Sequence, residues 1–102
     1  MAKQIIWSET TVNEFDLIRD YITENRSVEA AIRFVNEFYH QLDLIDSQAF
    51  IGIAHVENQL LRKRLIAKTY YLYYLVEEAD DTIRLLNIID TRSGPAKNPF
   101  SF

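Results

Sequence analysis

Cysteine is absent from this chain of 102 residues. Its absence excludes a disulfide scaffold, a thiolate metal site and a cysteine nucleophile. Glycine and proline are scarce, with two of each, which argues against a disordered or repetitive chain. No apolar run approaches the ~20 residues that a membrane-spanning helix needs, and the three apolar residues after Gln4 are too few for a signal peptide. We therefore expect one soluble domain, residues 1–102, located in the cytoplasm and away from the membrane.

An overall excess of basic residues is also missing. Eleven Lys and Arg stand against fifteen Asp and Glu, which gives a formal net charge of −4. Residues 1–50 hold four basic and nine acidic side chains, and residues 51–102 hold seven basic and six acidic ones. A nucleic-acid-binding domain usually carries a basic excess, because each phosphate contact displaces a counterion. Nonspecific binding to RNA or DNA is therefore disfavoured. The charge distribution leaves room only for a small basic patch that binds a site of defined shape.

Motifs for a metal or a cofactor are lacking as well. His40 and His55 are the only histidines, and neither stands at metal-binding spacing from another ligand. Gly52 and Gly94 lie too far apart to form a glycine-rich phosphate loop. We expect no metal and no cofactor, and we interpret both histidines as structural.

Apolar residues at helical spacing predict two helices. The stripe for a helix of about 9–24 consists of Val12, Phe15, Ile18 and Ile22. The stripe for a helix of about 28–46 consists of Ala31, Val35, Phe38, Leu42 and Ile45. Ser8 and Ser27 stand where N-caps are needed, and Thr11 with Glu14 has the spacing of a capping box. The short loop between the two segments predicts an antiparallel helix hairpin.

Strand patterns flank the two helices. They are expected at 4–7, in two weaker segments within 56–67 with a turn near 61–63, at 70–76 and at 82–90. Residues 47–53 are interpreted as a connector, and the acidic residues 77–81 as a hairpin loop. The predicted fold class is α+β with the order β-α-α-β-β-β(-β), an antiparallel sheet with the helix hairpin packed on one face.

Several short motifs together give a family resemblance. The first half carries Ile6-Trp7-Ser8, Phe15, Ile18 and Tyr21-Ile22, and the second half carries Arg62-Lys63, Lys68, Tyr74, Asp90-Thr91-Arg92 and Pro95. In this order and spacing, over about residues 4–97, the chain resembles the RelE/ParE toxins of bacterial type II toxin–antitoxin systems, in particular the ParE-like branch. The resemblance implies a plasmid-stabilising toxin that a cognate antitoxin neutralises by lying across the helix pair and the sheet edge. It also implies that the free toxin binds a cellular target such as DNA gyrase, without a cofactor.

Five residues are candidates for target binding: Arg62, Lys68, Tyr74, Arg84 and Arg92. The period of two along a strand predicts that Arg84, Asp90 and Arg92 project to one face. Arg92 either meets phosphate or an acidic partner, or it pairs with Asp90 on the surface.

Other charged and aromatic residues also have two interpretations. The basic cluster either lines a groove for RNA or an acidic antitoxin segment, or forms a solvated turn and edge strand; its members are Arg62, Lys63, Arg64 and Lys68. The tyrosines either stack on bases or belong to the core; they stand at 70, 71, 73 and 74.

Two alternatives to a target-binding toxin stay open. A ribosome-dependent messenger endoribonuclease of the RelE type would need a base near the carboxyl end, and no Tyr or His follows Arg92. The pI of about 5.1 also fits poorly with docking on ribosomal RNA. A non-toxic binding module would keep the same core residues. Phe50-Ile51-Gly52 departs from the many relatives that carry a proline ahead of this glycine. The sequence therefore leaves enzymatic activity open and catalytic residues unknown.

Overall fold

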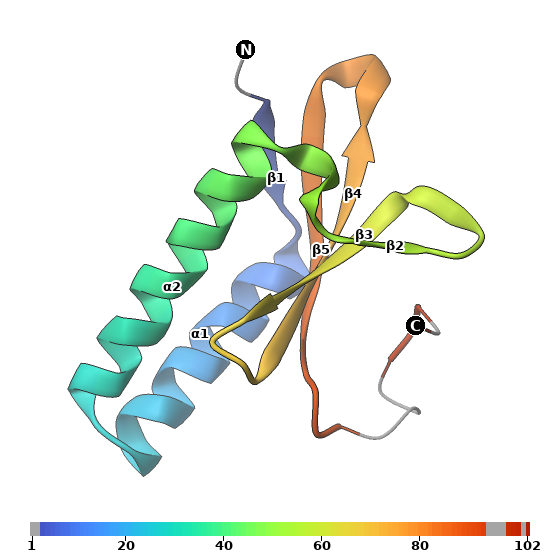
Figure 1. Ribbon diagram of the computed structural model, residues 1–102. Coiled ribbons are helices and arrows are strands. Elements are labelled where there is room, and N and C mark those ends of the chain that lie inside the picture. Colours follow the sequence, from blue (N-terminus) through green and yellow to red (C-terminus); the bar gives the residue numbers. More distant parts are fainter. Residues whose placement is uncertain (1–2, 94–97, 101) are drawn as a thin grey trace.

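The computed structural model describes residues 3–93, 98–100 and 102, and it has two layers, a helix hairpin and a sheet (Figure 1). The helices are α1 (Glu9–Asn25) and α2 (Val28–Ser47), with short 3-10 turns η1 (Ala49–Ile51) and η2 (Glu78–Asp80). The strands are β1 (Gln4–Trp7), β2 (Ile53–His55), β3 (Asn58–Ile66), β4 (Tyr70–Glu77) and β5 (Thr82–Asp90). Across the described ranges, no helix is both long and apolar enough to cross a membrane.

The sheet has the strand order β1-β5-β4-β3-β2, and the helix hairpin covers one of its faces. This confirms the predicted α+β class and element order. One pairing differs from the expected antiparallel sheet, because β1 runs parallel to β5. The chain between β1 and β5, which holds both helices and three strands, is long enough for the crossover that a parallel pair requires.

Both helices begin at the predicted serine caps. Ser8 Oγ accepts a hydrogen bond from the backbone N–H of Thr11 at 3.0 Å, and Ser27 Oγ accepts one from that of Ala30 at 3.0 Å. The predicted capping box is wrong, since the Glu14 carboxylate binds β5 instead. Thr11 is fully buried and bonds to the Ser8 hydroxyl, whereas Val12 of the predicted stripe is exposed.

The core lies between the helix hairpin and the inner face of the sheet. Its members with no exposed surface are Phe38, Ile45, Ile66, Leu72, Tyr74, Val76, Ile83 and Leu85. Removing an apolar side chain of this size from water contributes about 1.5–3 kcal/mol. Trp7 packs edge-on to Phe15 with ring centroids 5.4 Å apart, and this contact joins β1 to α1.

A single strand, β3, replaces the two weaker strands expected within residues 56–67. The turn falls at Val56 and Glu57, ahead of the position near 61–63 that we predicted. Arg62 pairs with Tyr74, and Arg64 pairs with Leu72; both partners point to the core. Two arginines at inward positions hide the apolar alternation by which a continuous strand is recognised.

The outer face of the sheet carries the last described residues of the chain. Tyr73 points to this face yet is only 2% exposed, because Phe100 stacks on its ring with centroids 4.7 Å apart. His55 Nε2 donates to the carbonyl oxygen of Phe100 at 2.8 Å. This contact gives His55 a structural role.

Candidate functional site

Tyr74, one of the five candidates for target binding, is a core residue. Its side chain is fully buried. The hydroxyl donates to the carbonyl oxygen of Ala49 at 2.8 Å and accepts from the backbone N–H of Gly52 at 3.0 Å. Burial raises the pKa of this hydroxyl, a change that the hydrogen bond from Gly52 opposes. Tyr74 therefore fixes the connector between α2 and β2 and has no surface to offer a target.

Arg62 also holds this connector. Its Nη1 donates to the carbonyl oxygens of Phe50 at 2.8 Å and Gly52 at 2.9 Å. The neighbouring Lys63 points to the opposite face, with Nζ 4.5 Å from the ring centre of Tyr71. The basic residues of β3 are thus divided between two faces, and the predicted basic cluster does not form one surface.

Arg84 lies on the outer face of the sheet, away from Asp90. In the pairing of β4 with β5, Tyr73 opposes Asn87 and Tyr74 opposes Leu85, so Leu86 is an extra residue. Such a bulge reverses the alternation of the side chains that follow it. The prediction that Arg84 and Asp90 share a face is therefore wrong. Arg84 Nε instead donates to Glu77 Oε1 at 2.6 Å.

Arg92 follows β5 and pairs closely with Asp90. Its Nε and Nη2 donate to the two carboxylate oxygens at 3.0 and 2.7 Å, and its backbone N–H adds a third bond at 2.8 Å. Hydrogen bonding to this side chain lowers the pKa of Asp90. The Arg92 side chain is still 70% exposed, so its outer edge is free to meet a partner.

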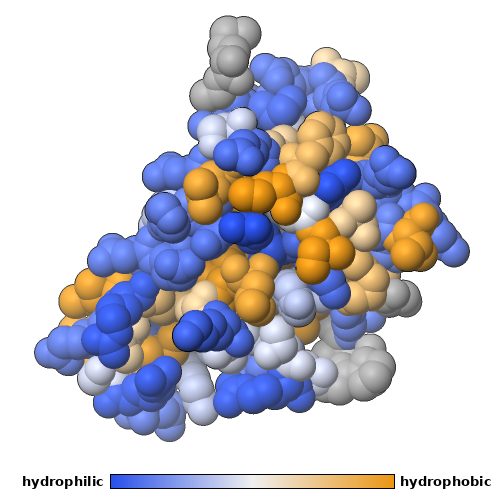
Figure 2. All heavy atoms as spheres, in the orientation of Figure 1, coloured by the Kyte–Doolittle hydropathy of each residue, from blue (hydrophilic) through white to orange (hydrophobic). Residues whose placement is uncertain are grey.

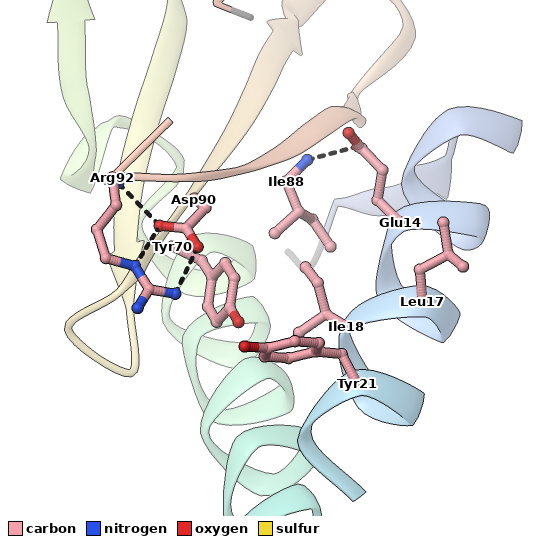
Figure 3. A pocket seen from close by; sticks show the side chains of 8 residues that line it. All are labelled: Glu14, Leu17, Ile18, Tyr21, Tyr70, Ile88, Asp90 and Arg92. Atoms are coloured by element: carbon pink, nitrogen blue, oxygen red, sulfur yellow. Dashed lines mark hydrogen bonds and ion pairs between the residues drawn. The ribbon is translucent and has the colours of Figure 1, made fainter. Parts of the chain in front are cut away.

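A cavity of about 450 Å³ lies between α1 and the end of β5, and we call it the notch (Figure 3). Its residues are Glu14, Leu17, Ile18, Tyr21, Tyr70, Ile88, Asp90 and Arg92. Leu17 and Tyr21 are 69% and 54% exposed. Since β1 pairs only with Thr82–Leu85, the remainder of β5 has no neighbouring strand on the notch side in the described part of the chain.

Glu14 sits at the junction of the notch and this strand edge. Its Oε1 accepts a hydrogen bond from the backbone N–H of Ile88 at 2.7 Å (Figure 3). Burial raises the pKa of Glu14, whereas the bonds from Ile88 and from the Asn87 side chain lower it by less. The carboxylate thus satisfies one amide of an open edge and contributes a partly desolvated charge to the notch.

Glu14→Gln is expected to flatten the pH dependence of stability. The pKa of Glu14 is higher in the folded chain than its ordinary value of 4.5. The contribution of Glu14 to stability is therefore fully present below pH 4.5 and is lost as the pH rises through the raised folded pKa. Gln retains the acceptor for Ile88 and carries no charge, so the variant should be the more stable protein at neutral pH. Urea unfolding of both proteins at several pH values checks this. A wild-type advantage that grows with pH would contradict it.

A second cavity, of about 1210 Å³, opens beside the notch and shares Tyr21, Tyr70 and Arg92 with it. We call it the basic basin, because four cations line it: Arg26, Arg33, Lys68 and Arg92. Lys68 and Arg92 are thus the two predicted target-binding residues that the fold brings to one place. Of the other three candidates, Arg62 and Tyr74 meet at the connector, and Arg84 pairs with Glu77 on the outer face of the sheet.

Comparison with known proteins places this architecture in a family. Residues 5–94 match the family model described as the ParE toxin of the type II toxin–antitoxin system parDE. The chain belongs to the ParE toxin family. Its structure is similar to a solved structure described as the chromosomal ParDE TA system from P. aeruginosa, with a TM-score of 0.70. That match covers 87% of this chain and 96% of the other at 18% identity, which shows a shared fold. No curated protein is matched by its sequence.

In this ParE-family chain two of the four basic candidates, Lys68 and Arg92, share a cavity. Arg62 and Arg84 are engaged in internal contacts. His40 lines the basic basin, whereas His55 lies on β2. Within the described residues, no three His, Asp or Glu side chains gather as a metal site. The arrangement offers surfaces for binding in the notch and the basin.

Sequence reasoning missed Arg26 and Arg33, which are isolated cations in the acidic half of the chain. It also missed Leu17 and named Tyr21 only as part of the family motif, although a signal for both exists. The two are four residues apart and lie off the apolar stripe of α1, which is the spacing of a second apolar surface on one helix. Pro95 of the family motif falls outside the described residues.

Proposed function

We propose that this chain is the toxin of a type II toxin–antitoxin pair, inhibited by a cognate antitoxin that seats an apolar segment in the notch. When free, the toxin acts by binding a macromolecular target such as DNA gyrase. The observation that carries the proposal is the apolar notch beside an open strand edge. Exposed apolar surface of this kind marks interaction sites, and a strand edge accepts an extended segment through backbone hydrogen bonds.

Action by binding agrees with how the basic side chains are used. Arg62 holds the connector, and Tyr74 supports it from the core. Arg84 pairs with Glu77 on the outer face of the sheet, where its side chain is 43% exposed. We assign target contact to Lys68 and Arg92, with Arg84 as a separate contact on the outer face. Arg62 and Tyr74 act indirectly, by shaping the fold.

Induction of the chain in bacteria, with and without the product of its neighbouring reading frame, tests the proposal. We expect growth arrest that the neighbouring product relieves, together with altered plasmid supercoiling and intact transcripts. Transcripts cleaved during translation would instead establish the endoribonuclease. Unchanged growth with no co-purifying partner would indicate a non-toxic binding module.

Arg92→Ala in the same assay separates target contact from general damage. Arg19→Ala is the matched control, because Arg19 is also an exposed arginine with acidic partners, Asp16 and Asp20. We expect only the Arg92 variant to weaken growth arrest, with both proteins folded to the same extent.

A further inference from the structure

Three basic side chains of the described chain have no internal partner, and all three line the basic basin. The other described cations are engaged: Lys3, Arg19, Arg84 and Arg92 in ion pairs, Arg62 and Arg64 with oxygen acceptors, and Lys63 above aromatic rings. Within the described residues, only Arg26, Arg33 and Lys68 make no ion pair, hydrogen bond or aromatic contact through their side chains. Unpaired charges gathered in one concavity indicate a site that is complete only with an anionic partner.

The fold alone brings these three residues together. Arg26 follows the last turn of α1, Arg33 lies on α2, and Lys68 lies in the turn between β3 and β4. That turn lies beside the helix hairpin in Figure 1, and residues from both sides line the cavity. The chain as a whole carries a net charge of −4, so the basin is a local reversal of sign.

The turn that presents Lys68 is strained. Ala67 and Lys68 have φ values of 52° and 63°, in the left-handed region where a side chain costs roughly 1–2 kcal/mol per residue. The loop has three residues, 67–69, and its two left-handed positions hold neither of the residues that adopt this region most readily, Gly and Asn. Strain held beside a cavity is consistent with a functional use of the side chain. Here it places an ammonium group on the rim of the basin.

Apolar residues line the basin together with the cations. Its apolar members are Ile22, Ala30, Phe34, Leu65 and Ala67. The acid among the lining residues is Glu37, whose carboxylate accepts a hydrogen bond from Gln41 Nε2 at 2.8 Å. A ligand that fills this cavity therefore needs both anionic groups for the cations and apolar groups for the apolar lining.

We propose that the basic basin binds a short acidic segment of a protein partner. Its carboxylates meet Arg26, Arg33 and Lys68, and its apolar side chains cover the apolar part of the lining. A nucleic acid would bring only its charged backbone to the cations and would leave the apolar part of the lining uncovered. The notch and the basin are contiguous, so one partner can occupy both. The assignment of the basin rests on the proposed function for one point alone, which is that the antitoxin is the protein that carries the acidic segment.

A peptide titration tests the basin directly. The probe is a short peptide in which Glu and Leu alternate, and the control peptide carries Gln in place of every Glu. Both are titrated into the full ¹⁵N-labelled chain, prepared by cell-free synthesis. We expect the acidic peptide to shift the amide signals around Arg26, Arg33 and Lys68, and to bind more weakly at high salt. Equal binding of both peptides, or no shift in the basin with the acidic peptide, would overturn the proposal.

Paired variants separate local charge from net charge. Arg33→Gln/Lys68→Gln removes two basin cations, whereas Lys3→Gln/Arg19→Gln removes two cations that lie outside the basin lining and pair with acids. The net charge is the same in both proteins. We expect roughly tenfold weaker binding of the acidic peptide for the basin variant and little change for the control. A single-stranded DNA of equal charge that binds the basin more tightly than the peptide would overturn the choice of partner.

Lys68→Gly separates loss of the Lys68 charge from loss of binding through misfolding. Glycine relieves the left-handed strain at this position, so the variant is expected to be more stable than the wild type. It should nevertheless bind the acidic peptide more weakly, since a rim cation is lost. Undiminished binding by this variant would exclude Lys68 from the site. The growth assay is independent of the titration, so failure of the proposed function and failure of the basin assignment give different results.

Discussion

Gly52→Ala is expected to lower the free energy of unfolding by about 2–4 kcal/mol. A Cβ atom at this position would lie 2.6 Å from the Tyr74 hydroxyl and 2.7 Å from the carbonyl oxygen of Lys63. The backbone of Gly52 is extended, with φ −73° and ψ 164°, so the requirement for glycine is one of space. The added methyl group would push β3 away or break the hydrogen bond between Tyr74 and Gly52.

Urea unfolding measures the effect of Gly52→Ala, with Ile53→Ala as the control. Ile53 is 58% exposed, so its truncation should change stability by about 0.5 kcal/mol or less. Tyr74→Phe removes the atom nearest to the new methyl group. The double variant Gly52→Ala/Tyr74→Phe should therefore be more stable than the sum of the single effects predicts. Wild-type stability of Gly52→Ala alone would contradict the steric argument.

Leu17→Glu is expected to release the toxin from antitoxin inhibition while leaving its fold intact. Leu17 is 69% exposed, so the substitution should alter the stability of the free chain by about 0.5 kcal/mol or less. In the proposed complex, the new carboxylate would be buried against apolar groups of the notch. Burying an unpaired charge is costly, and we expect affinity for the antitoxin to fall about 100-fold or more.

Ile32→Glu is the matched control for Leu17→Glu. Ile32 is also an exposed apolar helix residue, at 54%, and it lies outside the notch on α2. Co-purification and calorimetric titration with the neighbouring gene product compare the two variants. Growth arrest by Leu17→Glu should persist in the presence of that product. Equal inhibition of both variants would remove the notch from the antitoxin interface.

Features that depend on local sequence were predicted closely. The apolar stripes and serine caps predicted α1 and α2 within one residue at each end, because helical hydrogen bonds connect residues four apart. The aromatic run likewise predicted β4, whose residues on one face are all core residues. Such patterns are formed by residues that lie close together in the chain, so the sequence alone reveals them.

Features that depend on distant residues were predicted poorly. The continuity of β3 was hidden because Arg62 and Arg64 face inward, and their acceptors lie on η1, the connector and α2. The position of Arg84 was wrong because one extra residue in β5 reverses the faces of the strand. A bulge depends on the pairing of two strands, which the pattern of either strand alone does not reveal.

The amino-acid sequence by itself determined the two helices, the class of the fold and the family, because these follow from periodic burial and from motifs in a fixed order. Only the tertiary structure decided which charges are available. It engaged Arg62 and Arg64 with uncharged oxygen acceptors from other elements, and it paired Arg84 with Glu77 across the β4–β5 hairpin. It also placed Arg26, Arg33 and Lys68 around one cavity. The availability of a charge depends on its spatial neighbours, and the crossing of the helix hairpin over the sheet selects those neighbours.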